Sequence, residues 1–289
     1  MNHCKKHTFF QMIRKLYYLL PPSLRLVARR LYYFPLDMWE SLTGKRNPLV
    51  PPRGLIFTGP GDFLSTGERF LRYFVRYGNL QPHHRVLDIG SGIGRMAVPL
   101  TGYLTRGSYE GFDIVPQGIR WCQQNISRRF PNFRFTHIHL QNDLYTSQGQ
   151  SSLSFIFPYE KDDFDFVLLT SVFTHMLPEE VIHYMKEIHR VLKEGGRCLA
   201  TFFILNEEST QLLKNNRHFC FPYDYGYYRL MDNKVKHANV AYEENFMRKN
   251  LAEDNGFSVV HVLYGRWCGR PEEKSVDFQD IVVFEKKKG

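Results

Sequence analysis

The sequence has few cysteines, and their positions predict neither a disulfide framework nor a metal site. The five cysteines of the 289-residue chain are scattered and form no C-x-x-C pair, so free thiols in a reducing compartment are the simplest interpretation. The twelve histidines contain no H-E-x-x-H pattern and no other compact set of ligands. We therefore expect no metal cofactor.

Long apolar runs are also missing. No segment approaches the roughly 18 to 20 apolar residues that a membrane-spanning helix needs. The best early candidate, residues 16–20, is followed by Pro21 and Pro22 and lacks a small-residue cleavage site, so we expect no signal peptide. Hydrophobic residues at 43% and charged residues at 23% are ordinary for a globular protein. Together these features predict a cytoplasmic protein with a full hydrophobic core.

Acidic residues are nearly missing from the first 53 positions. This segment holds ten of the 38 basic residues but only Asp37 and Glu40 of the 29 acidic ones, so it has a net charge of +8 and the rest of the chain one of +1. The spacing of apolar residues predicts two short basic amphipathic helices. The first is at 9–20, and the second, which Ser23 can cap, has Leu24, Val27, Leu31 and Phe34 on one stripe. These helices could lie on an anionic membrane surface or pack on the domain behind them. The nearly neutral remainder does not indicate a nucleic-acid channel.

After a proline-rich connector at 47–54, strand-like and helix-like segments alternate, which predicts a doubly wound α/β fold with a mostly parallel sheet. The expected elements are strands at 85–89, 108–114, 133–139, 164–169, 197–205, 258–264 and 280–285, and helices at 70–78, 119–130, 178–192 and 240–256. This order predicts a seven-stranded sheet with helices on both faces. The expected domains are a helical extension at 1–53 and a main domain at 54–289, with an insertion around 206–240 covering a substrate.

The most informative segment, from Val86 to Arg95, is an apolar strand followed by three alternating glycines. Such glycines let the backbone turn sharply and let a ligand approach main-chain atoms. Arg95 stands where a dinucleotide fingerprint has its third glycine, and no Walker lysine pattern is present, so neither a pyrophosphate site nor phosphoryl transfer from ATP is predicted. Asp113 ends the next predicted strand, where a carboxylate can accept both hydroxyls of a ribose. These residues indicate a nucleoside-like ligand without a pyrophosphate.

Four motifs, in this order and spacing, resemble those of the class I S-adenosylmethionine-dependent methyltransferases. They occupy residues 86–94, 110–113, 165–175 and 192–196. The resemblance implies a Rossmann-like fold, S-adenosylmethionine as the cofactor and S-adenosylhomocysteine as the product. A narrower resemblance, at 61–63, 94–100 and 277–280, is to bacterial methyltransferases associated with sugar or glycan modification.

The resemblance also implies a set of cofactor-binding residues at the ends of predicted strands. They are Asp88, Gly90, Ser91, Gly92, Asp113, Ile114, Asn142, Asp143, Thr170 and Ser171. Asp113 would bind the ribose diol, Asp88 would lie near the ammonium group, and Asn142 or Asp143 would meet the adenine amino group. The alternative is that several of these residues only shape the turns.

Transfer of an activated methyl group mainly requires in-line positioning, and a general base is useful where the acceptor is an alcohol. The catalytic candidate is His175, which follows the strand at 164–169 at the edge where ligands bind in open α/β sheets; a histidine there can also be purely structural. The substrate-binding candidates are His218, Tyr242, Trp267 and Arg270. An aromatic cluster at 219–228 suits a sugar ring or an aromatic acceptor, and equally a hydrophobic lid.

The sequence thus predicts an S-adenosylmethionine-dependent O-methyltransferase acting on a small molecule or a glycan. Two alternatives stay open. One is a cofactor-binding regulatory or scaffold protein without turnover. The other is a methyltransferase acting on RNA or protein, presented through the basic N-terminal segment.

Overall fold

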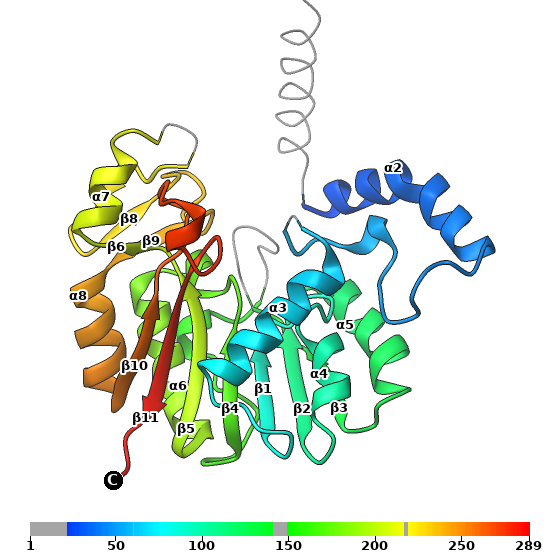
Figure 1. The fold of residues 1–289 in the computed structure, drawn as a ribbon, viewed down its shortest axis with the longest axis horizontal. Helices are drawn as coiled ribbons and strands as arrows, with labels where there is room; N and C mark the ends of the chain where they lie inside the picture. The colour runs from blue at the N-terminus through cyan, green and yellow to red at the C-terminus, as the bar shows by residue number, and fades with distance from the viewer. Residues whose placement is uncertain (1–21, 60, 141–148, 217–218) are drawn as a thin grey trace, which may run out of the picture. The chain divides into compact units, whose positions relative to one another are not determined.

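The computed structural model describes residues 22–59, 61–140, 149–216 and 219–289 (Figure 1). The chain divides into two compact units, Met1–Gly61 and Asp62–Gly289. The predicted helix at 9–20 lies outside the described residues. None of the helices in the described part of the chain combines the length and the apolar character that a bilayer crossing requires.

The first unit contains helix α2 (Pro22–Leu42) and a 3-10 turn, η1 (Arg53–Leu55). The predicted second helix is present and continues beyond Phe34, through Pro35, to Leu42. The carboxylate of Asp37 accepts hydrogen bonds from the main-chain N–H groups of Arg53 and Gly54 at 2.7 and 3.0 Å. The polar face of α2 is therefore attached to the η1 turn.

The second unit is built on a seven-stranded sheet in the order β10-β11-β5-β4-β1-β2-β3. Its strands are β1 (Arg85–Ile89), β2 (Ser108–Asp113), β3 (Phe133–His137), β4 (Phe164–Leu169), β5 (Leu192–Phe202), β10 (Phe257–Leu263) and β11 (Asp280–Lys286). Strand β11 is antiparallel to both neighbours, and the other pairs are parallel. The predicted Rossmann-like, mostly parallel seven-stranded sheet is confirmed.

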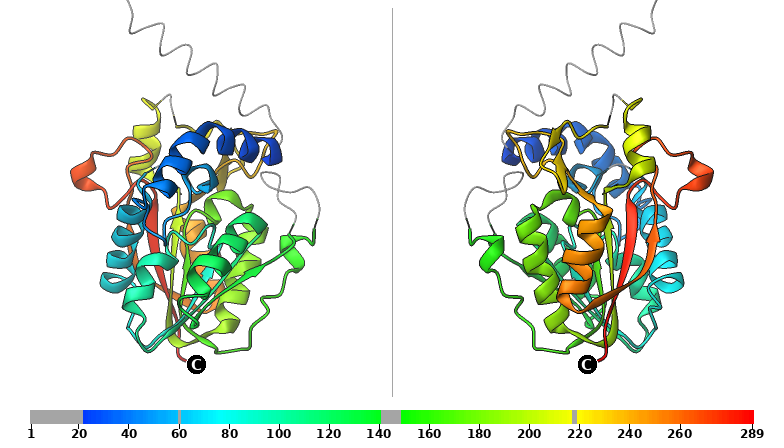
Figure 2. Two further views of the ribbon diagram at one scale, coloured as in Figure 1. Left: turned by 90° about the vertical axis from the view of Figure 1, so that its right-hand side faces the viewer. Right: turned by 90° about the vertical axis from the view of Figure 1, so that its left-hand side faces the viewer.

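Helices cover both faces of this sheet, as the two side views show (Figure 2). They are α3 (Phe63–Arg76), α4 (Ala97–Tyr103), α5 (Pro116–Cys122), α6 (Pro178–Val191) and α8 (Glu244–Phe246), which continues through 247–255. Helix α7 (Glu207–Leu213) lies above the sheet in Figure 1. Alternate residues of β4 face opposite helices, because successive strand side chains point to opposite faces. Phe166 meets Phe74 of α3 edge to face, with ring centroids 5.7 Å apart, whereas Val167 and Leu169 join the core cluster that includes Val181 of α6.

A second, four-stranded sheet of order β6-β9-β8-β7 lies above the β5 half of the main sheet in Figure 1. It contains β6 (Ile204–Leu205), β7 (Tyr223–Asp224), β8 (Tyr228–Leu230) and β9 (Val240–Glu243). The prediction of a helix over the whole of 240–256 was therefore wrong at its start. Val240–Glu243 pairs with both β6 and β8, and the helical segment begins only at Glu244. Partners distant in the sequence decided this conformation.

Candidate active site

The glycine-rich turn after β1 has a backbone that only glycine adopts easily. Gly90, Gly92 and Gly94 have φ angles of 78°, 58° and 81°, in the left-handed region. A β-carbon on Gly90 would lie 2.5 Å from Cγ2 of Val172, which follows β4. The N–H groups of Gly90 and Ser91 donate to the carbonyl of Phe112 in β2, at 2.9 and 3.0 Å. The turn is thus held between the ends of β2 and β4.

Asp113, the last residue of β2, supports the same turn. Its Oδ2 accepts a hydrogen bond from the N–H of Gly92 at 2.8 Å, and its Oδ1 one from the N–H of Val115 at 2.7 Å. Burial raises the pKa of this carboxyl to about 6. Each carboxylate oxygen has a second lone pair, so the group can still accept hydroxyl protons from a ligand beside the turn.

Asp88 lies deeper, within β1, and is fully buried. Its Oδ2 accepts a hydrogen bond from the hydroxyl of Tyr109, and burial raises its pKa to about 7. Within the described part of the chain, Asp88 Oδ1 and the nearby Ser91 Oγ are buried and have no hydrogen-bond partner. Two orphaned polar atoms therefore lie at the turn, and such atoms are costly unless a ligand or water completes them.

Ser171, two residues after β4, connects three strand ends. Its φ of 59° is unusual for a residue other than glycine, and such strain concentrates at functional sites. Its N–H donates to Oγ1 of Thr201 in β5 at 2.7 Å, and its hydroxyl donates to Oε1 of Gln279, just before β11, at 2.9 Å. Ser171 is thereby tied to both halves of the sheet edge, with Thr170 beside it.

His175 ends the short 3-10 turn η4 (Phe173–His175). Its Nδ1 lies 2.9 Å from the carbonyl oxygen of His237, whose own Nε2 lies 3.1 Å from Oε2 of Glu180. Burial lowers the pKa of His175, so the ring is neutral near pH 7. A proton on Nδ1 is required for donation to a carbonyl, and that tautomer leaves the lone pair on Nε2.

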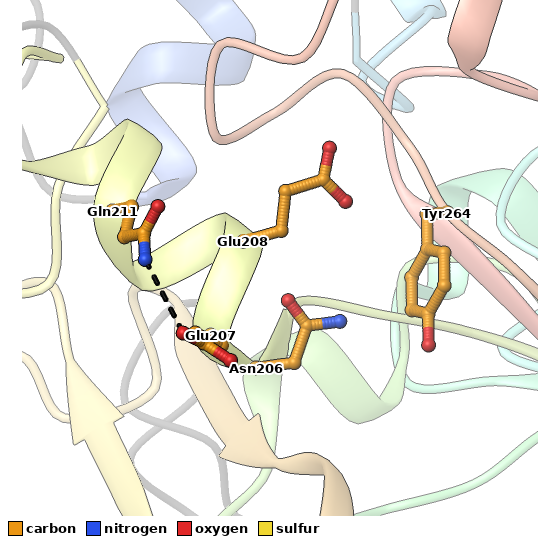
Figure 3. A pocket seen from close by; sticks show the side chains of 5 residues that line it. All are labelled: Asn206, Glu207, Glu208, Gln211 and Tyr264. Carbon is orange, nitrogen blue, oxygen red and sulfur yellow. Dashed lines mark hydrogen bonds between the residues drawn. The ribbon is translucent and has the colours of Figure 1, made fainter.

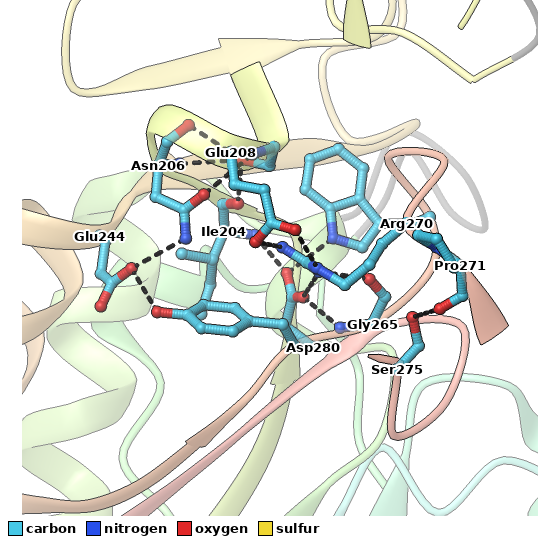
Figure 4. A network of polar contacts seen from close by, with 12 residues as sticks. Ile204, Asn206, Glu208, Glu244, Gly265, Arg270, Pro271, Ser275 and Asp280 are labelled. Atoms are coloured by element: carbon cyan, nitrogen blue, oxygen red, sulfur yellow. Dashed lines mark hydrogen bonds and ion pairs between the residues drawn. The ribbon is translucent and has the colours of Figure 1, made fainter. Parts of the chain in front are cut away.

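Asp280, the first residue of β11, is the centre of a polar network at the same edge (Figure 4). It is 1% exposed and accepts hydrogen bonds from the N–H groups of Ile204 and Gly265, both at 2.6 Å, and from Nε1 of Trp267 at 2.7 Å. Burial raises its pKa to about 6. Arg270 continues the network by donating to the carbonyl of Gly265 at 2.6 Å and pairing with Glu208 at 3.0 Å.

A polar pocket of about 510 Å³ borders this network (Figure 3). The side chains that line it all offer hydrogen-bonding groups: Asn206, Glu207, Glu208, Gln211 and Tyr264. Tyr264 follows β10 and Asn206 follows β6, at the edge where β1, β2, β4 and β5 also end. The pocket and the glycine-rich turn therefore lie on one edge of the sheet, where ligands bind in open α/β folds.

The structure brings some of the candidates from the sequence together at the site and places others away from it. It brings Gly90, Ser91, Gly92, Asp113, Ile114, Thr170 and Ser171 to the carboxyl ends of β1, β2 and β4. Tyr242 is fully buried, and its hydroxyl donates to the main-chain carbonyl of Met176. Trp267 and Arg270 meet at Asp280, behind the pocket. Asn142, Asp143 and His218 lie outside the described residues.

Three residues of the site were not anticipated from the sequence: Thr201, Gln279 and Asp280. Their roles depend on contacts across 13 to 108 positions of the chain. The available signal in the sequence was Asp280 itself, an acid directly before the four apolar residues 281–284 of the final strand. A carboxylate in such a place needs buried donors, and here it finds three.

A family model described as a methyltransferase domain matches residues 63–262, which is more than half of the chain. The chain belongs to this methyltransferase family. Its fold and motifs are those of the class I S-adenosylmethionine-dependent superfamily. The match includes the glycine-rich turn, Asp113 and His175.

Among curated proteins, the methyltransferase is similar to phthiotriol/phenolphthiotriol dimycocerosates methyltransferase 1 of Mycobacterium ulcerans, with 31% identity over 117 residues, 40% of this chain and 36% of that protein. It is 24% identical over 150 residues to phosphoethanolamine N-methyltransferase 2 of Caenorhabditis elegans, covering 52% of this chain and 30% of that protein. The aligned segments thus span about a third of the length of these relatives.

Among solved structures, the methyltransferase shares its fold with the PH0226 protein of Pyrococcus horikoshii, with a TM-score of 0.52 and 17% identity over 78% of this chain and 90% of that one. A Galdieria sulphuraria protein, provisionally described as a sarcosine dimethylglycine methyltransferase, gives a TM-score of 0.52 and 16% identity over 78% and 85%. These likenesses concern the fold alone.

Proposed function

We propose that this methyltransferase transfers a methyl group from S-adenosylmethionine to a hydroxyl group of a small molecule or glycan. The observation on which the acceptor rests is the pocket, lined by side chains with hydrogen-bonding groups, on the same sheet edge as the glycine-rich turn. The hydrogen bond between Ser171 and Gln279 joins the two halves of that edge. Cofactor and acceptor would then approach each other above β4 and β5.

For the cofactor, the residues present fit the group. The orphaned Asp88 Oδ1 and Ser91 Oγ suit the donors and acceptors of an amino-acid end, and the open main chain of Gly90 and Gly92 permits close approach. Asp113 suits a ribose diol, with Ile114 beside it for the base. S-adenosylmethionine supplies an activated methyl group when bound. The protein then has to orient the acceptor and exclude water.

For the acceptor, the pocket favours a molecule with several hydroxyl groups. Its five lining side chains comprise two carboxylates, two amides and a phenol, so it offers both donors and acceptors. The hydroxyl of Tyr264 already donates to Glu244 at 2.8 Å, which fixes its orientation. The predicted insertion around 206–240 would cover this side of the acceptor.

His175 is the proposed base. An alcohol keeps its proton far above neutral pH, so a neutral imidazole that can accept a proton in the transition state accelerates its methylation. The contact of Nδ1 with the carbonyl of His237 fixes the ring in the required tautomer. The amide of His175→Gln should still donate a hydrogen bond to that carbonyl, but kcat should fall about 100-fold or more. The decrease of kcat at acidic pH should then disappear.

Calorimetry with S-adenosylhomocysteine tests the cofactor site, and a mass-shift screen of hydroxylated acceptors tests the reaction. Once an acceptor is found, Glu207→Gln should raise its KM and leave S-adenosylhomocysteine affinity unchanged. Glu272→Gln is the matched control, because Glu272 also lies in the first turn of a short helix, outside the pocket. An equal KM in both variants would remove the pocket from the proposal.

An amine acceptor is the second candidate, and the observation that favours it is the pair of carboxylates, Glu207 and Glu208, in the pocket wall. A neutral amine is already nucleophilic and needs little help from a base. His175→Gln would then leave kcat nearly unchanged at pH 8. Turnover of RNA or protein, or cofactor binding without any turnover, would instead support the alternatives left open by the sequence.

A further inference from the structure

The N-terminal helix α2 has its polar and apolar faces in an unusual arrangement. A surface helix of a globular protein normally buries its apolar stripe and exposes its polar one. In α2 it is the polar face that contacts the rest of the first unit, at the η1 turn. Asp37 accepts from the N–H groups of Arg53 and Gly54, Glu40 pairs with the Arg53 guanidinium at 2.8 Å, and Arg29 Nε donates to the Arg53 carbonyl at 3.3 Å.

The opposite face of α2 is apolar and exposed. Side chains spaced by three and four residues fall on one stripe of a helix, and here they are Leu24, Val27, Leu31, Phe34 and Met38, which are 50%, 51%, 71%, 60% and 49% exposed. Tyr32 and Trp39 extend the stripe on one side, at 75% and 53% exposure. Such a continuous exposed apolar surface is typical of a docking site.

The charges around this stripe are basic. Both acids of the helix are engaged by the η1 turn, whereas Arg30 and Lys45 are exposed. The ammonium group of Lys45 lies 4.8 Å from the centre of the Trp39 ring. An aromatic ring with a cation beside it is suited to the boundary between lipid headgroups and acyl chains.

A second copy of the helix fits this stripe less well. A coiled coil places charged residues on both sides of its apolar seam, but on one side of this stripe the corresponding residues are Ala28 and Pro35. Pro35 also lacks the N–H that completes a regular helix. We propose that the exposed face of α2 docks on an anionic lipid surface, with its apolar stripe in the interface and its basic residues at the headgroups. This docking is independent of the acceptor's identity.

The chain contains its own spectroscopic probe for this test. Of its three tryptophans, Trp121 and Trp267 are buried at 8% and 1% exposure, and only Trp39 is exposed. With full-length protein and vesicles of phosphatidylcholine containing phosphatidylglycerol, we expect co-sedimentation and a blue shift of tryptophan emission. Trp39→Phe should keep most of the binding and lose the shift. Vesicles of phosphatidylcholine alone, or high salt, should bind less.

The decisive variant is Leu31→Glu with Phe34→Glu, which should lower vesicle partitioning at least about tenfold, since two exposed apolar anchors become charged. Ile156→Glu is the matched control, because Ile156 is 68% exposed in the second unit, and it should bind vesicles as wild type does. Absence of wild-type binding, or equal binding by the double variant, overturns the proposal.

Two further outcomes would show that the exposed face of α2 binds something other than lipid, and each would overturn the proposal. A lipid-free dimer in sedimentation velocity that the double variant dissociates would identify a second copy. A lower unfolding temperature of the double variant than of Ile156→Glu would identify the chain's own second unit.

Discussion

Replacing Gly90 by alanine should destabilise the fold in two ways, through the left-handed backbone conformation and through a steric overlap with Val172. Gly90 has a φ of 78°, and alanine in that left-handed conformation costs about 1–2 kcal/mol. The added methyl would also lie 2.5 Å from Cγ2 of Val172, and relieving such an overlap costs about 1–3 kcal/mol. We therefore expect Gly90→Ala to lower the free energy of unfolding by about 2–5 kcal/mol.

Gly226→Ala provides the control for backbone conformation alone. Gly226 has a φ of 87°, but a β-carbon there would meet nothing within 4 Å. Its cost should stay near 1–2 kcal/mol. Adding Val172→Ala to Gly90→Ala removes the clashing methyl, so the double-mutant cycle should show a favourable coupling of about 1–3 kcal/mol.

Urea unfolding followed by circular dichroism measures the stability of Gly90→Ala, Val172→Ala, their combination and Gly226→Ala. Calorimetry with S-adenosylhomocysteine reports on the turn itself. We expect cofactor affinity to fall in Gly90→Ala and to recover in part with Val172→Ala. The reasoning is refuted if Gly90→Ala destabilises no more than Gly226→Ala, or if the cycle shows no coupling.

Further predictions concern three buried carboxylates. Burial raises the pKa of Asp113 to about 6 in the folded protein, above its value in the unfolded chain. The contribution of this carboxyl to folding stability therefore falls as pH rises from about 4 to 6. Relative to wild type, Asp113→Asn should gain up to about 2 kcal/mol of stability over that range, measured by urea unfolding. The same variant should bind S-adenosylhomocysteine at least tenfold more weakly at pH 8, by roughly 1.4 kcal/mol; equal affinity would contradict the ribose role. Tyr109→Phe leaves the buried Asp88 without its donor and should cost about 1–3 kcal/mol at pH 8 and less at pH 5, where Asp88 is protonated; an equal loss at both pH values would contradict this. Asp280→Asn should cost about 2–4 kcal/mol, because an amide oxygen replaces two carboxylate oxygens that accept three hydrogen bonds, including that of Trp267. A loss below about 1 kcal/mol would argue against the network.

The parallel half of the sheet could be predicted from the sequence because its signals are local. Arg85–Ile89 and Phe164–Leu169 are short apolar runs bounded by turn residues, and both strands have the predicted limits. The glycines after β1 identify their turn in the same way, since the required φ angles are a property of the residue itself. Local chemistry decides these elements.

The small sheet and the Asp280 network could not be predicted in this way. Val240–Glu243 precedes a helix and was included in it, because the β6 and β8 partners that make it a strand are not visible in its own residues. The donors to Asp280 likewise come from Ile204 and from Gly265 and Trp267, which only the folded chain assembles. Tertiary contacts override local propensity at these positions.

The small sheet also makes this protein suitable for chimeras. The segment between β6 and β9 leaves and re-enters the domain at neighbouring positions, because Leu205 is paired with Glu243. Its β7–β8 hairpin can therefore be shortened, lengthened or replaced by that of another methyltransferase without changing the distance between the graft points. An exchange of the whole segment replaces Asn206 and Gln211 of the pocket and has to retain His237, whose carbonyl contacts His175, while the glycine-rich turn and Asp113, on separate strands, stay as they are. Acceptor preference could then be altered by recombination rather than by point substitution.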